Sequence, residues 1–169
     1  MHKLFTLLCF IVAITVQAQP NLELTSRGFE PVEAEVPSTP NEKLITTSEN
    51  WAREFNRRQK GVDITGVTAN SMSISAFKKN AFFIRSKGEM YEYTIHYTIK
   101  LKFNVSSYTL QFNVNDIYTD ADKLVKYKLP DYFTSDGSLK EGYSELKPSL
   151  ERTVNEIVTS HYNYLINFR

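Results

Sequence analysis

The strongest constraint on the fold is a strict alternation of residue types between positions 91 and 103. Apolar and aromatic residues occupy every second position, as Tyr91, Tyr93, Ile95, Tyr97, Ile99, Leu101 and Phe103. Polar or charged residues fill the positions between them. A period of two predicts a long strand with one buried and one solvated face. The pattern returns from Tyr108 to Val114 after a turn at 104–107, which predicts a hairpin.

Further elements are predicted on both sides of this hairpin. A half-buried strand covers 29–36, and Pro31 places its start or the whole strand at a sheet edge. A helix begins with a capping box from Thr39 to Glu42 and stops at Gly61. Two short strands cover 62–68 and 72–77, followed by a polar interruption at 78–80, and a second helix covers 148–167. This order predicts an α+β fold, in which a curved antiparallel sheet carries both helices on one face.

The first 18 residues are typical of a secretory signal peptide. A positive start at Lys3 precedes an apolar run, and Ala18 ends a cleavage pattern. The run of about 13 residues is shorter than the roughly 20 that span a bilayer, so no transmembrane anchor is expected after cleavage. Cys9 lies in this run and is the sequence's one cysteine. We therefore expect an exported protein, periplasmic or secreted, without a disulfide.

The length of 169 residues predicts one domain after the signal peptide. Residues 19–27 are expected to form a flexible lead-in, and residues 28–169 a single α+β domain. Within that domain, 28–118 supply the sheet and the first helix. Residues 119–147 form a long connection, and 148–167 form the C-terminal helix.

Charge and motif spacing argue against several classes of function. A net charge of +1 disfavours a nucleic-acid partner, which usually requires a strong basic excess. His96 and His161 have no second histidine at metal-ligand spacing, and both are expected at the surface or its rim. We therefore predict no catalytic residue, no metal site and no cofactor.

Two groups of carboxylates are expected to be solvated. The cluster Asp116, Asp120 and Asp122 lacks the central glycine and final glutamate of a calcium loop. Glu33 and Glu35 alternate with apolar residues, which places both on the wet face of an edge strand. An acid–base pair there is the less favoured alternative.

The aromatic residues give the candidate binding surface. Tyr91, Tyr93 and Tyr97 share one face of the long strand, where core packing is favoured. If that face is partly open, they would instead stack on a sugar ring or an aromatic peptide. Tyr132 and Phe133 in the long connection complete the set.

The sequence resembles a family of secreted proteins from Bacteroidetes, the domain of unknown function 4468, which has a TATA-binding-protein-like fold. The resemblance rests on the signal peptide, on Gly28-Phe29-Glu30-Pro31-Val32, on Trp51, and on the tyrosine-rich strand Met90–Phe103 with its partner through Val114. It covers roughly residues 27–118. It implies the same order of strands and helices, and it brings no catalytic residues with it.

The sequence is compatible with three functions of different kinds. The favoured hypothesis is a non-enzymatic binding module of the cell envelope, whose partner is an envelope protein. The alternatives are a carrier of a small ligand or lipid, and an enzyme that processes polysaccharides or peptides. In each case we expect no nucleic-acid partner.

Overall fold

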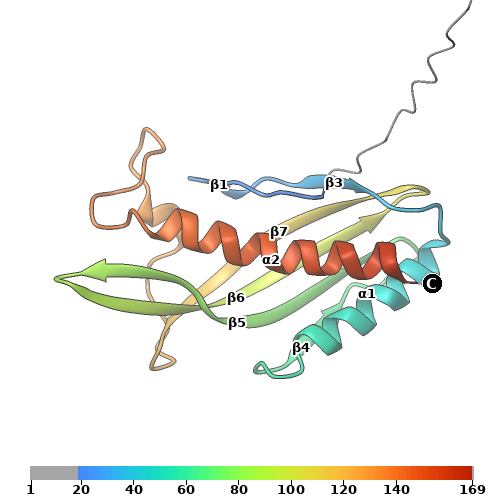
Figure 1. Ribbon diagram of the computed structural model, residues 1–169, viewed down its shortest axis with the longest axis horizontal. Helices are drawn as coiled ribbons and strands as arrows, with labels where there is room; N and C mark the ends of the chain where they lie inside the picture. Colours follow the sequence, from blue (N-terminus) through green and yellow to red (C-terminus); the bar gives the residue numbers. More distant parts are fainter. Residues whose placement is uncertain (1–18, 169) are drawn as a thin grey trace, which may run out of the picture.

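The computed structural model describes residues 19–168, so the predicted signal peptide and its cleavage site lie outside the described residues. The elements follow the predicted order, with two short strands added at the start (Figure 1). The strands are β1 (Leu24–Thr25), β2 (Gly28–Phe29), β3 (Val32–Glu35), β4 (Val62–Thr65), β5 (Ser71–Ser86), β6 (Glu89–Phe103) and β7 (Ser107–Thr119). The helices are α1 (Asn41–Phe55), the short 3-10 helix η1 (Leu129–Tyr132) and α2 (Leu146–Asn167).

Five strands form one open antiparallel sheet in the order β3-β7-β6-β5-β4, and β1 and β2 form a separate ribbon. The predicted hairpin is confirmed, since β6 pairs with β7 and Phe103 lies opposite Tyr108. The alternation also holds. From Ile95 to Phe103 the odd-numbered residues of β6 are buried, whereas Lys100 and Lys102 are exposed. The α+β fold class expected from the sequence is therefore correct.

β5 differs from the prediction because it continues through the polar residues at 78–80. Its pairing with β6 breaks after Lys78 and resumes at Phe82, and Asn80 has a φ of 51°. This is a β-bulge, which absorbs extra residues without ending the strand. Beyond the bulge, β5 and β6 continue past the end of β7 to a turn at Lys87 and Gly88 (Figure 1). We call residues 82–93 the arm.

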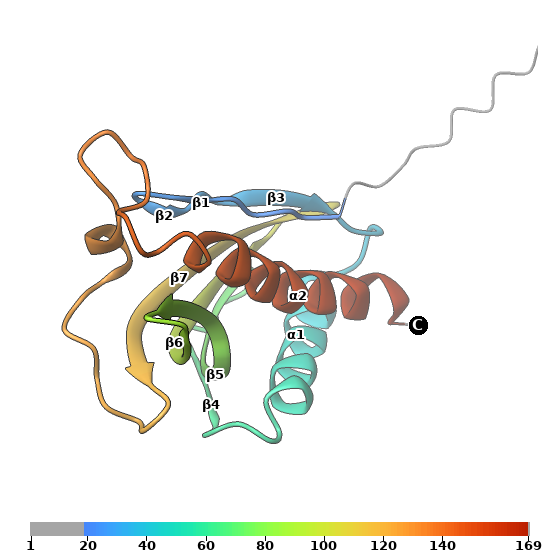
Figure 2. The ribbon, with the colours of Figure 1, turned by 60° about the vertical axis from the view of Figure 1, so that its left-hand side comes forward.

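Both helices lie on one face of the sheet and leave the other face open (Figure 2). The inner side of α2 is fully buried, through Leu146, Leu150, Val154, Ile157 and Val158. From α1, Trp51 is 2% exposed, and its indole N–H donates to Ser160 Oγ at 3.1 Å. No helix within residues 19–168 is long and apolar enough to cross a membrane.

The start of α1 differs from the predicted capping box. Pro40 occupies the N-cap position, and no side chain caps the helix. The carbonyl of Pro40 accepts the N–H of Lys43 at 3.0 Å. Thr39 and Glu42 therefore play no capping role, because the helix begins one residue later than the box requires.

The end of α1 also comes earlier than Gly61. The helix ends at Phe55, and the Asn56 side chain donates to the Ala52 carbonyl at 2.8 Å. The Asn56 amide oxygen accepts the hydroxyl of Tyr97 at 3.2 Å. A buried asparagine that bonds the last turn competes with continuation of the helix, and the sheet holds it in place.

Residues 19–27 are held on α2 and do not form the flexible lead-in that we expected. Leu22 and Leu24 are 2% and 1% exposed. Asn155 of α2 accepts the N–H of Leu22 at 2.7 Å and donates to its carbonyl at 2.9 Å. The N–H of Leu24 donates to Glu151 at 2.7 Å. Two buried leucines and three long-range hydrogen bonds fix this segment.

Candidate functional site

His161 lies in the core rather than at the surface where we expected it. Position 161 continues the apolar side of α2, three residues after Val158. There its Nε2 lies 3.0 Å from Ser48 Oγ. The rings of Trp51 and Tyr108 pack edge-on against it. Burial lowers the pKa of the imidazole to about 3, so it is neutral at pH 7.

A serine beside a histidine is the pairing used by nucleophilic enzymes. Here both residues have 0% exposure, so no substrate reaches the serine hydroxyl. The pair therefore belongs to the core, where the hydrogen bond joins Ser48 Oγ to His161 Nε2, while His161 Nδ1 is buried without a partner among residues 19–168.

His96 is half-buried on the open face of the sheet. Its ring stacks on Phe77 with 4.7 Å between centroids, and its Nδ1 lies 3.5 Å from Asp116 Oδ2. Lys128 Nζ donates to Asp116 Oδ1 at 2.6 Å, and this bond is the main cause of the lowered pKa of Asp116. Within residues 19–168 no group of three or more histidines, cysteines or carboxylates is placed to hold a metal ion.

The five residues of the predicted binding surface do not come together. Tyr97 is fully buried, and Tyr132 and Phe133 are 4% and 7% exposed, so these three are core residues. Burial accordingly raises the pKa of Tyr97 well above its ordinary value. Tyr91 is 46% exposed and Tyr93 is half-buried, so these two remain accessible on the arm.

Tyr91 and Tyr93 line two open hollows beside the arm. One, of about 420 Å³, also contains Glu92 and Asp120, and the other, of about 410 Å³, contains Tyr143. However, the Tyr91 hydroxyl already donates to Glu89 at 2.6 Å. One face of Tyr93 is also covered by Phe82, 4.9 Å away and nearly parallel. The arm therefore offers less stacking surface than the tyrosine run predicts.

The outer edge of β7 is covered at both ends but not in its middle. β3 pairs with residues 107–110. The connection after β7 covers residues 115–119, where Val125 donates to the Ile117 carbonyl and Lys128 donates to the Asn115 carbonyl. Within the described chain, the backbone groups of Phe112 and Val114 have no hydrogen bond to either covering segment. We call residues 111–114 the β7 window.

β3 does not extend over this window. Its ladder with β7 ends at Val32, and the preceding residues Gly28 and Phe29 pair with β1 instead. Phe29 of β2 then packs edge-on against Phe112, with 5.7 Å between ring centroids.

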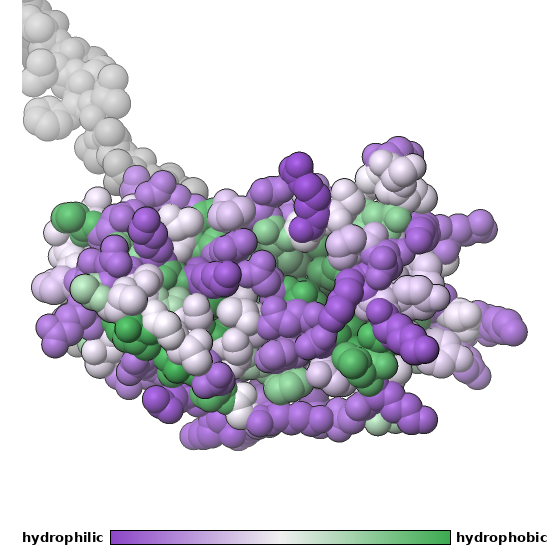
Figure 3. All heavy atoms as spheres, turned by 180° about the vertical axis from the view of Figure 1, so that it is seen from behind, coloured by the Kyte–Doolittle hydropathy of each residue, from purple (hydrophilic) through white to green (hydrophobic). Residues whose placement is uncertain are grey.

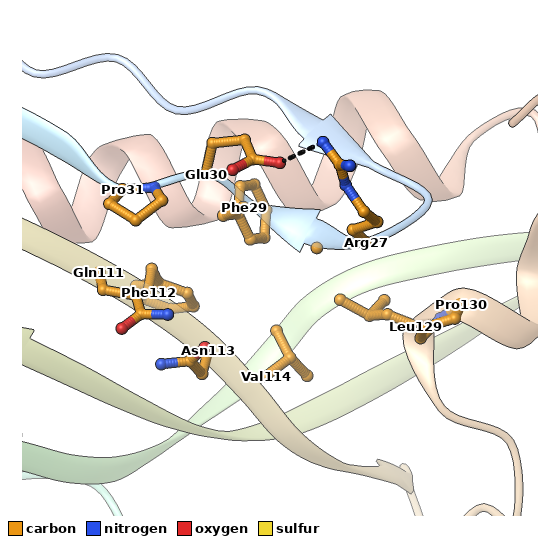
Figure 4. A pocket seen from close by; sticks show the side chains of 11 residues that line it. Arg27, Phe29, Glu30, Pro31, Gln111, Phe112, Asn113, Val114, Leu129 and Pro130 are labelled. Atoms are coloured by element: carbon orange, nitrogen blue, oxygen red, sulfur yellow. Dashed lines mark hydrogen bonds and ion pairs between the residues drawn. The ribbon is translucent and has the colours of Figure 1, made fainter.

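The result is a groove of about 530 Å³ beside the window (Figure 4). Residues 27–31 form one side, β7 forms the other, and Leu129 and Pro130 of η1 lie at one end. Arg27 and Glu30 form an ion pair of 3.0 Å on the first side. Sequence reasoning found Pro31 as an edge residue, but no local pattern indicated that η1 would return to this edge.

An open antiparallel sheet with two helices on one face is the TATA-binding-protein-like architecture, and two solved structures share it with this chain. One is a DUF4468 family protein from Bacteroides ovatus, with a TM-score of 0.58 and 11% identity over 83% of this chain and 86% of the other. The second is a TBP-like protein from Parabacteroides distasonis, with a TM-score of 0.55 and 12% identity over 83% of this chain and 93% of the other.

These comparisons support the resemblance to the domain of unknown function 4468, at the level of the fold. No family model matches the sequence, and no curated protein matches it. Function must therefore be argued from the molecule's own surfaces.

Proposed function

We propose that this chain is a non-enzymatic binding module of the cell envelope that takes an extended segment of a partner protein into the groove beside β7. The observation that carries the proposal is the β7 window. A strand edge with unpaired backbone groups is a template for another strand. The signal peptide expected from residues 1–18 supports the compartment.

The pairing pattern determines which backbone groups face the groove. In an antiparallel ladder, successive residues turn their N–H and C=O alternately toward one neighbouring strand and the other. The N–H of Val36 donates to the Ser106 carbonyl at 2.9 Å, so even-numbered residues face the β3 side. This phase continues to Phe112 and Val114, because the bulge in β7 comes after them. Two N–H and two C=O groups are therefore directed at the groove.

The side chains around the window favour a particular sequence pattern in the partner. Residues opposite Phe112 and Val114 would direct their side chains toward the helix side, near Phe29 and Leu129. The residue between them would lie on the open face, beside Gln111 and Asn113. An apolar–polar–apolar segment fits this alternation. Four backbone bonds of about 0.5–1.5 kcal/mol each give weak binding, so the apolar side chains must supply the rest.

The charge of the open face supports a partner other than DNA, despite the name of the fold. Lys100 and Lys102 lie on the central strand β6, but the edge strands carry Glu33, Glu35 and Asp63. A surface that follows a phosphate backbone needs a continuous basic stripe.

Peptide selection with residue-resolved hydrogen exchange tests the proposal. Random nine-residue peptides are selected on phage against residues 19–169, and the selected sequences are synthesised. We expect apolar–polar–apolar cores that slow amide exchange at Phe112 and Val114 by at least about tenfold. The amide of Asn113 is the internal control, since it points toward β6 and should not respond.

A second peptide separates backbone pairing from side-chain adhesion. Methylating one amide of the selected core removes a donor to the Phe112 or Val114 carbonyl, and we expect affinity to fall by about tenfold. Peptides that bind without protecting either amide, or that tolerate methylation at every core position, would refute docking at the β7 window.

A further inference from the structure

The open face of the sheet contains a second hollow, which adjoins the β7 window and shares Gln111 with it. It has a volume of about 500 Å³, within the range of small-ligand sites. It crosses three strands, and its polar side chains are Ser71, Ser73, Lys100, Lys102, Thr109 and Gln111. Seen from behind the helices, the molecular surface is largely hydrophilic with scattered apolar patches (Figure 3).

The sheet register arranges these side chains in two rows. Lys100 lies between Ser73 of β5 and Gln111 of β7. Lys102 lies between Ser71 and Thr109. Rows two residues apart are separated by about 6.6 Å, and neighbouring strands by about 4.8 Å. Each row therefore offers one ammonium group flanked by two hydrogen-bonding side chains, over an area close to that of one sugar ring.

Most of these polar groups have no partner within the described chain. Lys100 and Lys102 are in no ion pair or hydrogen bond there, and the hollow has no carboxylate in its lining. Ser73, Thr109 and Gln111 likewise have no side-chain hydrogen bond among residues 19–168. Ser71 alone of the six is bonded, to Thr68 at 2.8 Å.

Farther along the same face, near Thr98 and Asp116, polar side chains do bond one another. There, Thr98 bonds Ser75 at 2.8 Å and Asn115 at 2.7 Å, and Asp116 pairs with Lys128. These side chains therefore satisfy one another, whereas the two lysines of the hollow have no such partner within residues 19–168. Two cations with no carboxylate between them favour an anion there, and the surrounding hydroxyl and amide groups favour a hydroxylated ligand.

We infer that this hollow binds a small sugar that carries an anionic group, with Lys100 and Lys102 on the phosphate or carboxylate. Ser73, Thr109 and Gln111 bond the sugar hydroxyls. The site uses side chains rather than the backbone groups of Phe112 and Val114, so it does not require strand addition, although Gln111 lines both sites.

Calorimetric titration with four probes tests the inference and identifies the source of the anion. The probes are glucose 6-phosphate, glucuronate, inorganic phosphate and glucose, each at low salt with residues 19–169. We expect one of the two anionic sugars to bind at least about fivefold more tightly than inorganic phosphate and at least about tenfold more tightly than glucose. The preferred sugar shows whether the site takes a phosphate or a carboxylate.

Lysine variants locate the binding. Lys100→Gln and Lys102→Gln should each weaken the preferred probe by at least about fivefold. Lys126→Gln, an exposed lysine of the long connection, is the matched control and should leave affinity unchanged. Equal affinity for inorganic phosphate and both anionic sugars would mean an adventitious ion only. That result, absence of binding by all four probes, or an equal loss in the Lys126→Gln control would each overturn the inference.

Discussion

Protonation of His161 should make the fold sensitive to mild acid. In the folded chain the imidazole is fully buried and its pKa is lowered from 6.5 to about 3, whereas in the unfolded chain it has the ordinary value. Below pH 6.5 the unfolded state therefore binds a proton that the folded state excludes. By linkage, the free energy of unfolding is highest above pH 6.5 and falls as the pH drops toward 3.

The size of the effect follows from the shift. At pH 5.0 the solution lies 1.5 units below the ordinary pKa, and each unit corresponds to 1.36 kcal/mol. The histidine should therefore lower the free energy of unfolding by about 2 kcal/mol between pH 7.5 and 5.0. Its closest polar and aromatic neighbours, Ser48, Trp51 and Tyr108, do not titrate in this range, so they add nothing to the slope.

Urea unfolding at pH 7.5 and 5.0 measures this contribution directly. In His161→Gln the group no longer titrates, so the variant should lose about 2 kcal/mol less than the original protein over the same interval, whatever its stability at pH 7.5. Identical pH dependence in the original protein and His161→Gln would refute a neutral buried imidazole.

Two further changes test other parts of the fold. Gly88→Ala should lower the free energy of unfolding by about 1 kcal/mol in urea titrations, because Gly88 has a φ of 83° while its added Cβ would meet no atom within 4 Å; no loss would show that the turn relaxes. Asn155→Ala removes both bonds to Leu22 and should cost about 1–3 kcal/mol, with faster amide exchange at Leu22 and unchanged exchange in the centre of β6. Unchanged exchange at Leu22 would mean that burial of the leucines holds the segment without Asn155.

The parts of the fold that the sequence predicts correctly are those encoded by a repeated local period. The alternation from Tyr91 to Phe103 predicts β6 because each residue type reports which face it occupies. The errors fall where one tertiary contact decides the outcome. Asn56 ends α1 because it bonds Tyr97 of a distant strand, and no helix-stop rule includes that partner.

Candidate site residues were harder to predict for the same reason. A tyrosine in a strand has the same local pattern whether a helix covers it or not, so Tyr97 and Tyr91 cannot be distinguished by period alone. The β7 window depends on the pairing of β2 with β1 and on the return of η1, which are about a hundred residues apart in the sequence. The local spacing of residues cannot predict that two such distant segments meet at one sheet edge.

The attachment of Leu22 to Asn155 has a consequence for the timing of folding. These residues are separated by 133 positions, and the chain emerges from the ribosome in order, starting at its N-terminal end. Leu22 and Leu24 consequently have no place to be buried until nearly the whole sequence has emerged. During synthesis, the first segment of the domain therefore stays exposed until the last helix is available, and chain truncation before Glu151 would leave it without a partner.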